Sequence, residues 1–112
     1  MTRKYNQLPQ VAFAILLAIS LKPRHGYEIM KQVAEDSEGK IKLRPGALYT
    51  SIKQLNDQGL IEEVDAEADS RRRYYRLSKA GKKTLAAELK YYQATVRLAR
   101  DRKVLTLEPE NG

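Results

Sequence analysis

Apolar residues recur at helical spacing near the start of the chain and predict a first helix that begins at Pro9. Proline suits the first turn of a helix because its missing N–H is not needed there. One apolar face is formed by Leu8, Val11, Ala12, Ile15, Leu16 and Ile19. Phe13, Ala14 and Leu17 broaden this face, so we expect the helix to be buried on most sides. A dimer contact or a ligand cavity would account for so much apolar surface.

The next helix is predicted between two stretches that interrupt helical structure. It covers residues 27–34, after a breaker-rich connection at residues 22–26. An acidic, glycine-containing stretch at residues 35–40 ends this second helix. Residues 41–43 then alternate between apolar and polar, as a very short strand would.

Residues 44–61 hold the third helix, on which the functional prediction depends. Pro45 suits its first turn, and Gly59 is a typical helix stop. Its inward face consists of Leu48, Ile52 and Leu55. Its outward face is small and hydrogen-bonding, with one acid, and consists of Ala47, Thr50, Lys53, Gln54 and Asp57. Such a helix can enter a DNA major groove, although polar outer faces are also the norm for ordinary surface helices.

After Gly59 the apolar period changes from 3.6 to 2, which predicts two strands. The strands cover residues 60–65 and 72–77, and a polar hairpin tip at residues 66–70 joins them. Three helices followed by a strand, a wing and a strand are typical of a winged helix-turn-helix. We therefore expect a mostly α fold with a small β wing.

The last helix is predicted to start after Ser78, a good N-cap, and to continue to about Leu105. Apolar residues spaced by four, three, four and three form a seam like the a and d positions of a coiled coil: Leu85, Leu89, Tyr92, Val96 and Ala99. The seam predicts a partner helix from a second copy; packing on the first helix of the same chain is the alternative. The expected organisation is a DNA-binding domain at residues 1–78, a dimerisation helix at residues 79–105 and a disordered tail at residues 106–112.

Composition excludes several classes of protein. The 112 residues contain no cysteine, which removes disulfides and cysteine-based zinc sites. The longest apolar run, at residues 11–19, is about half of what a bilayer requires, so we expect a cytoplasmic protein without membrane contact. The single histidine, His25, has no neighbouring carboxylate cluster, and we expect a turn residue rather than a metal ligand. Neither catalytic residues nor a cofactor site is indicated.

The positive charge is concentrated in one part of the chain. Net charge is +7. Residues 71–103 hold twelve Lys and Arg against Glu88 and Asp101, which leaves this segment at +10. Such a segment can bind phosphate or can be a solvated helix face, and composition does not decide between the two.

Three motifs give the sequence a family resemblance. They are HGYEI at residues 25–29, GALYTSIKQLNDQGLI at residues 46–61 and RRRYYRLSKAG at residues 71–81. Their order and spacing resemble the PadR family of bacterial transcriptional regulators over about residues 11 to 100. The resemblance implies a dimeric winged-helix DNA-binding repressor of the short subfamily, which has a single C-terminal helix. Ala47 and Thr50 depart from the family pattern on the outward helix face, which implies a different operator preference.

The candidate DNA-binding residues fall into three groups. Direct base contacts are expected from Ala47, which can meet a thymine methyl, and from Thr50, Ser51 and Gln54, of which Gln54 can pair with adenine. Phosphate contacts are expected from Arg44 and Lys53, although Lys53 can also reach guanine. The remaining candidates are Tyr27 beside Gly26, Tyr49, and the wing arginines Arg71, Arg72 and Arg73. For the tyrosines, plain packing is the alternative, and for the arginines, charge balance with the acidic wing tip.

The partners expected from this interpretation are double-stranded DNA, a second copy of the chain, and a small hydrophobic or aromatic effector. Two recognition helices would enter successive major grooves of a pseudo-palindromic site. A ligand cavity between subunits is predicted at Val11, Ile15, Tyr91 and Tyr92, with plain dimer core as the alternative. A protein-interaction module and a nonspecific DNA-binding protein are the other functions that the sequence allows.

Overall fold

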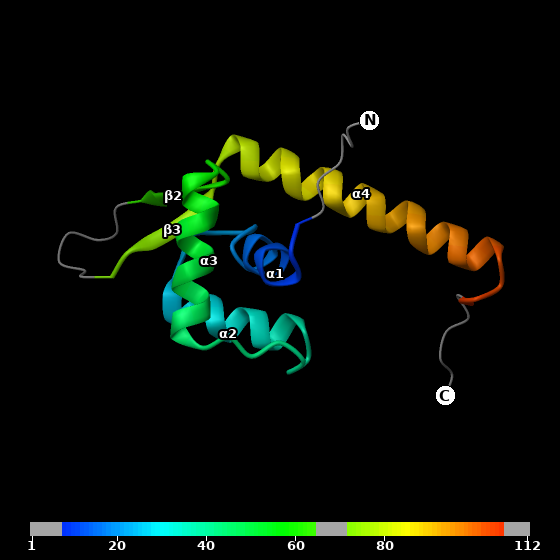
Figure 1. The fold of residues 1–112 in the computed structure, drawn as a ribbon, viewed down its shortest axis with the longest axis horizontal. Helices are drawn as coiled ribbons and strands as arrows, with labels where there is room; N and C mark the ends of the chain where they lie inside the picture. Colours follow the sequence, from blue (N-terminus) through cyan, green and yellow to red (C-terminus); the bar gives the residue numbers. More distant parts are fainter. Residues whose placement is uncertain (1–7, 65–71, 107–112) are drawn as a thin grey trace.

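Four helices and a three-stranded antiparallel sheet make up the described part of the chain, residues 8–64 and 72–106 (Figure 1). The elements in chain order are α1 (Gln10–Ala18), β1 (Arg24–His25), α2 (Gly26–Asp36), α3 (Pro45–Asp57), β2 (Ile61–Val64), β3 (Tyr74–Leu77) and α4 (Lys79–Asp101). This computed structural model confirms the mostly α winged-helix fold with a small β wing. Arg71, the hairpin tip at residues 66–70 and most of the C-terminal tail lie outside the described residues.

The sheet differs from the prediction at one strand. Its order is β1-β3-β2, and β1 pairs Arg24 with Tyr75 and His25 with Tyr74. The strand expected at residues 41–43 is wrong, because this segment is irregular and its two apolar side chains pack against the core. The short strand β1 instead lies in the connection expected at residues 22–26. A two-residue strand has no periodicity of its own, so the free edge of β3 decides where it forms.

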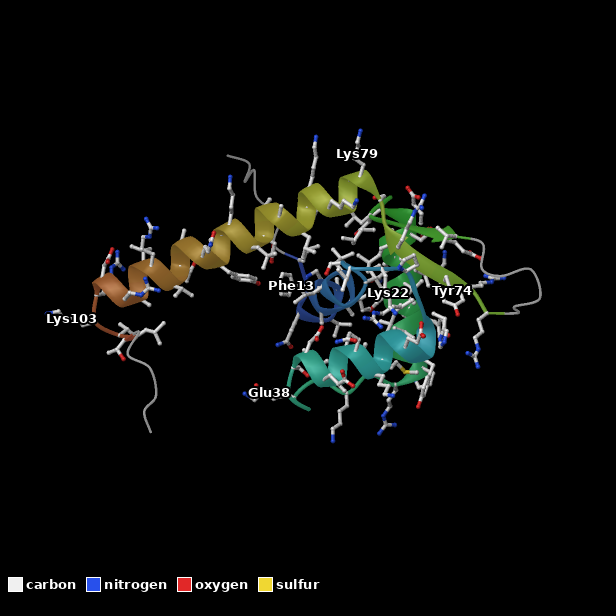
Figure 2. All side chains as sticks on the ribbon, turned by 180° about the vertical axis from the view of Figure 1, so that it is seen from behind. Phe13, Lys22, Glu38, Tyr74, Lys79 and Lys103 are labelled. Carbon is white, nitrogen blue, oxygen red and sulfur yellow. The ribbon has the colours of Figure 1, made fainter. Side chains whose placement is uncertain are left out.

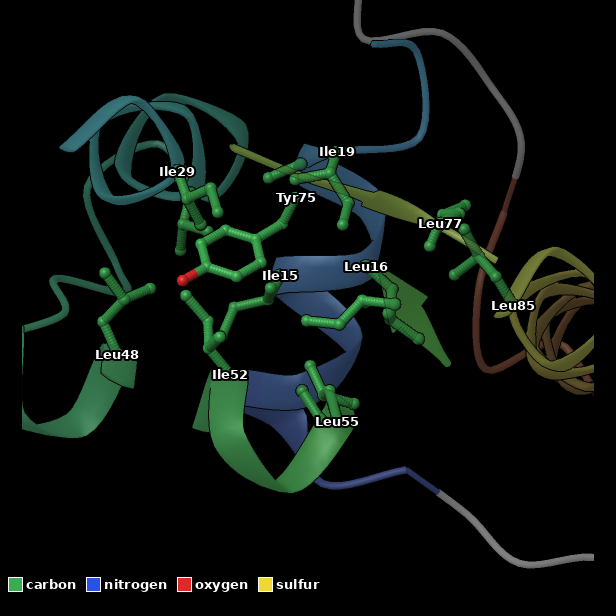
Figure 3. Packing of buried hydrophobic residues seen from close by; sticks show 14 residues of the cluster. Ile15, Leu16, Ile19, Ile29, Leu48, Ile52, Leu55, Tyr75, Leu77 and Leu85 are labelled. Atoms are coloured by element: carbon green, nitrogen blue, oxygen red, sulfur yellow. The ribbon is translucent and has the colours of Figure 1, made fainter. Parts of the chain in front are cut away.

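The core is built around α1, which packs against α2, α3 and α4. Ile15, Leu16 and Ile19 are at most 2% exposed, and their side chains meet those of the other elements in Figure 3. Each fully buried Ile or Leu stabilises the fold by about 1.5–3 kcal/mol. The neighbours contributed by the other elements are Ile29, Leu48, Ile52, Leu55, Tyr75, Leu77 and Leu85. The prediction that the first helix is buried on most sides is thus confirmed.

Three residues fix α4 onto the rest of the domain. Ser78 Oγ accepts a hydrogen bond from the Gly81 N–H at 2.9 Å and donates one to the Gly59 carbonyl at 2.6 Å, so the predicted N-cap is confirmed. Gly59 has φ +75, a left-handed conformation that glycine adopts without steric cost. A Cβ at Gly81 would overlap the Leu60 carbonyl oxygen. The start of α4 therefore lies directly against the turn between α3 and β2.

The end of α4 comes earlier than the sequence predicted, at Asp101 rather than near Leu105. Lys103 adopts φ +62, and the N–H of Val104 donates to the Ala99 carbonyl at 2.8 Å. A left-handed residue followed by this hydrogen bond is a common way to end a helix. Among the helices of residues 8–64 and 72–106, none combines the length and apolar character that crossing a bilayer requires.

Candidate nucleic-acid interface

The outward face of α3 is set by the burial of its inward face. Leu48, Ile52 and Leu55 are at most 4% exposed, which turns the opposite side of the helix to solvent. The exposed candidates on α3 and at its N-cap are Arg44, Ala47, Thr50, Lys53 and Gln54, whereas Ser51 is half-buried. Of the six candidate residues on α3 and at its N-cap, five are therefore exposed to solvent.

Lys53 is exposed but has a partner. Its Nζ lies 3.2 Å from Asp57 Oδ2, one helical turn further along α3. Both side chains are largely exposed, and an exposed pair of this kind is worth about 0.3–0.5 kcal/mol. The ion pair with Asp57 therefore holds Lys53 only weakly.

Tyr49 crosses from α3 to the start of α2. Its side chain is half exposed, and its hydroxyl sits where a Cβ would be if residue 26 were not glycine. Gly26 therefore allows the Tyr49 hydroxyl to approach the N-terminus of α2. Tyr27, the next residue of α2, is 65% exposed, so neither tyrosine ring lies in the core.

His25 joins α2 to the wing, a role that the sequence analysis missed. It is the N-cap of α2: its Nδ1 accepts from the Glu28 N–H at 3.4 Å, and Glu28 Oε1 accepts from the His25 N–H at 3.1 Å. Its Nε2 lies 3.2 Å from Arg72 Nη1. The ring is buried, with an edge-to-face contact to Tyr74 at 5.3 Å and a stacked contact to Tyr27 at 6.4 Å.

The two nitrogens of His25 cannot both accept at once. A neutral imidazole has one acceptor nitrogen and one N–H, so the ring accepts from the Glu28 amide or from Arg72. The sequence signal for this role was a capping-box spacing, with Glu28 three residues after the N-cap. It was not recognised because histidine stands where serine or threonine is usual.

Two of the three wing arginines, Arg72 and Arg73, lie in the described part of the chain, just before β3. Arg72 lies beside His25, and Arg73 Nε lies 3.6 Å from Glu63 Oε2 on the neighbouring strand. Arg76 donates to Glu62 at 3.0 and 3.1 Å across the same pair of strands. Arg71, the third wing arginine, lies outside the described residues.

A pocket of about 360 Å³ collects these side chains, and we name it the junction pocket. It is lined by His25, Gly26, Tyr27, Tyr49, Arg72, Arg73 and Tyr75. Burial, reinforced by the Glu63 carboxylate, raises the pKa of the Tyr75 hydroxyl above 10.0, against the opposing effect of Arg73. The hydroxyl is therefore neutral at physiological pH. The three motifs of the sequence thus meet at one point beside α3.

The seam of α4 divides into buried and exposed positions. Leu85 is 6% exposed and belongs to the core of its own chain, which is the intramolecular packing that the sequence left as an alternative. Tyr92 is half-buried and meets Phe13 of α1 edge-to-face at 5.3 Å. Leu89 and Val96 are 41% and 40% exposed and lie along a surface groove. Ala99 is half-buried.

Within one chain, the residues predicted to line a ligand cavity divide between the core and the surface. Ile15 is fully buried beside Ile52 and Tyr75 (Figure 3), whereas Tyr91 is 48% exposed. The rings of Tyr91 and Tyr92 lie 5.7 Å apart, and Val11 is half-buried.

Glu88 is a second position that the sequence analysis missed. This carboxylate is 1% exposed and accepts a hydrogen bond from the Tyr92 hydroxyl at 3.1 Å. The four-residue spacing on one helix face was the available signal. Within residues 8–64 and 72–106, no cluster of His, Asp and Glu is arranged to hold a metal ion.

Comparisons with known proteins agree with this architecture. Residues 15–87 match the transcriptional regulator PadR-like family. An uncharacterized protein from Lysinibacillus sphaericus is 30% identical over 78 residues, which are 68% of this chain and 72% of that protein. A crystal structure of a PadR family transcription regulator from Clostridium difficile R20291 is 25% identical with a TM-score of 0.72, covering 83% of this chain and 97% of that one.

A further structure, Bacillus subtilis PadR in complex with operator DNA, shares the fold. It has a TM-score of 0.61 at 23% identity and covers 72% of this chain and 47% of that chain. The family match extends over all of α2, α3 and the wing strands. The chain therefore belongs to the PadR-like family and is a transcriptional regulator rather than an enzyme.

Proposed function

We propose that this regulator inserts α3 into a DNA major groove and holds the adjacent phosphates around the junction pocket. One observation carries the proposal: exposed hydroxyls and guanidinium groups from three separate motifs meet beside the outward face of α3. Tyr27 and Tyr49 supply hydroxyls, and Arg72 and Arg73 supply charge. Bacillus subtilis PadR is bound to operator DNA in a structure with this fold, which supports the same mode of docking here.

Base recognition belongs to the exposed positions of α3. Gln54 can form a bidentate pair with adenine, Thr50 can donate or accept, and Ala47 can contact a thymine methyl. Half-buried Ser51 is the weakest candidate of the group. Since Ala47 and Thr50 depart from the family pattern, we expect the preferred half-site to differ from those of other family members.

Phosphate binding belongs to the junction pocket, Arg44 and Lys53. The N-terminus of α2 adds a partial positive charge beside the Tyr49 hydroxyl, which lies against Gly26. Arg72 and Arg73 each have a partner within the chain, which holds them close to the pocket before DNA arrives. Arg71 extends the same basic segment in the sequence, and we expect it to add a phosphate contact.

A homodimer is the assembly that the exposed seam supports. Leu89 and Val96 leave an apolar stripe on α4 that a second copy of α4 would cover, with Tyr92 and Ala99 at its edge. Two copies of α3 would then enter major grooves about 34–36 Å apart on a pseudo-palindromic operator. Occupation of such a site represses transcription when it blocks the promoter.

An effector site is proposed at the same interface. Tyr91 and Val11 are incompletely covered within one chain, so a small hydrophobic or aromatic molecule can occupy the space between subunits. It would act by changing the spacing of the two α3 helices, and it needs different affinities for the two arrangements.

Selection of bound sequences from a random DNA pool tests the function directly. We expect two inverted half-sites with centres about 10 base pairs apart. Enrichment without symmetry would contradict the dimer arrangement, and absence of enrichment would favour a nonspecific DNA-binding protein. A protein-interaction module would show no salt-dependent retention on a DNA column, since loss of phosphate contacts at high salt is general for DNA binding.

A further inference from the structure

The outer face of α4 carries a row of positive charge that DNA reading by α3 does not use. We call it the basic ridge, and it consists of Lys79, Lys82, Lys83, Lys90, Arg97 and Arg100. All six side chains are exposed. In Figure 2, Lys79 points away from α1 and α2.

The spacing of these residues places them in a line. Lys79, Lys83, Lys90 and Arg97 follow each other at intervals of four, seven and seven residues. At 3.6 residues per turn and 1.5 Å per residue, they lie within about 40° of each other and extend over about 27 Å. The remaining two members flank this line on one side.

The positive charge of the basic ridge is not neutralised within the described structure. Glu88, which is 1% exposed, is one of the two acids of α4. The other, exposed Asp101, lies one turn from Arg97 at the end of the ridge. None of the ion pairs among residues 8–64 and 72–106 includes a ridge residue. Like charges three and four residues apart on a helix repel each other, so the ridge destabilises α4 until an anion covers it.

The ridge lies on a different side of the protein from the DNA-reading surface. The seam residues Leu85 and Tyr92 face the core. They are more than 90° around the helix from the line of Lys79, Lys83, Lys90 and Arg97, and about 60–80° from Lys82 and Arg100. Helix α1 packs between α4 and α2, and α4 leads away from the wing (Figure 1). A duplex bound by α3 therefore leaves the line of Lys79, Lys83, Lys90 and Arg97 accessible. Arg100 lies beside Leu89 at the groove that the second α4 would cover.

We propose that the basic ridge binds the phosphate backbone of a second DNA duplex, so that one protein molecule bridges two DNA segments. The proposal rests on the proposed function only for the first duplex, which α3 holds. A linear set of cations matches a polyanion, and about 27 Å corresponds to roughly eight base pairs of B-form DNA.

A lipid surface fits the basic ridge less well than DNA does. Membrane-bound helices insert bulky apolar side chains beside their cations. Around the helix, Ala86 and Gln93 lie between the ridge cations. The exposed apolar residues at the edge of the ridge, Leu89 and Val96, belong to the seam that a second copy of α4 would cover. Binding through such a surface is electrostatic and independent of base sequence, because phosphates carry no sequence information.

The test is a bridging assay with two charge-matched variants. Beads carry a selected operator duplex, and a fluorescent duplex of mixed sequence is retained only if the protein binds both. We expect Lys83→Glu/Lys90→Glu to lower retention at least tenfold, while its operator affinity, measured by anisotropy, changes by no more than about twofold. The control Lys31→Glu/Lys40→Glu changes the same charge at exposed positions on and after α2 and should retain the second duplex.

Four results would overturn the proposal. In the first, the ridge variant retains the second duplex; in the second, it loses operator affinity as much as it loses retention. In the third, the control variant loses retention as much as the ridge variant does. In the fourth, the wild-type protein binds phosphatidylserine vesicles through the ridge but does not bridge two duplexes. Failure of the proposed function would be seen separately, as a selection that yields no operator. The beads would then carry mixed-sequence DNA, and the expected loss in the ridge variant would be the same.

Discussion

Replacing His25 by alanine and by asparagine separates its contact with α2 from its contact with the wing. Alanine removes both the N-cap acceptor and the ring. A lost cap costs about 1 kcal/mol, and each of the two ring contacts, to Tyr27 and Tyr74, is worth about 0.5–1.5 kcal/mol. We expect His25→Ala to lower the free energy of unfolding by about 2–4 kcal/mol. Asparagine is a good N-cap and should recover about 1 kcal/mol of this loss.

DNA binding gives the second measurement on the same two variants. Without the imidazole, Arg72 loses the Nε2 atom that lies 3.2 Å from its Nη1. This nitrogen accepts from Arg72 in the tautomer whose Nδ1 carries the proton, and the other tautomer caps α2. Ordering a long side chain on binding costs about 0.5–1.5 kcal/mol, which corresponds to about two- to tenfold weaker binding. Both His25 variants should show this loss with an unchanged salt dependence, because Arg72 still reaches the phosphate once DNA is bound. By contrast, Arg72→Gln should lower the salt slope by about 0.9.

The assays are urea unfolding followed by circular dichroism and titration of a labelled duplex at several salt concentrations. If His25→Asn is as unstable as His25→Ala, the cap does not contribute as described. If both variants bind DNA with wild-type affinity, the role of His25 in positioning Arg72 is refuted.

Four further predictions concern base reading, assembly, packing and pH. Gln54→Ala should weaken operator binding by about 1–3 kcal/mol in titrations and leave binding to random DNA unchanged. Leu89→Asp should give monomers in analytical ultracentrifugation and abolish operator binding, because a charge would lie in the seam. Gly81→Ala should destabilise the fold by about 1–3 kcal/mol in urea unfolding, since the added methyl overlaps the Leu60 carbonyl. The raised pKa of Tyr75 stabilises the fold below pH 10, so stability should fall as pH rises above 10, less steeply in Tyr75→Phe.

Each of these has an outcome that contradicts it. If Gln54→Ala weakens binding to random DNA as much as binding to the operator, Gln54 does not read bases. If Leu89→Asp still forms a stable dimer, the dimer interface does not include Leu89. Gly46→Ala is the control for Gly81, because nothing lies near its added methyl, and equal effects of the two would refute the packing argument. If the stability of Tyr75→Phe falls above pH 10 as steeply as that of the wild type, other groups cause the loss of stability at alkaline pH.

Structural features that depend on residues close together in the chain could be predicted from the sequence. The apolar periods located α1, α3 and α4, because burial of one helix face requires a fixed spacing whatever lies opposite. The Ser78 cap and the stop at Gly59 were predictable for the same reason, since both depend on neighbouring backbone groups. The motifs around Tyr49 and Arg72 pointed to the correct family.

Tertiary structure alone decided the features that need a distant partner. Strand β1 exists because the edge of β3 lies beside residues 24 and 25. Burial of Glu88 and Leu85 depends on which face of α4 meets α1 and the sheet, which a periodic pattern leaves open. The junction pocket is the clearest case: residues 25–27, 49 and 72–75 meet only after α2, α3 and the wing have packed around α1. Sequence spacing determines which side chains share a face, whereas long-range packing determines which faces meet.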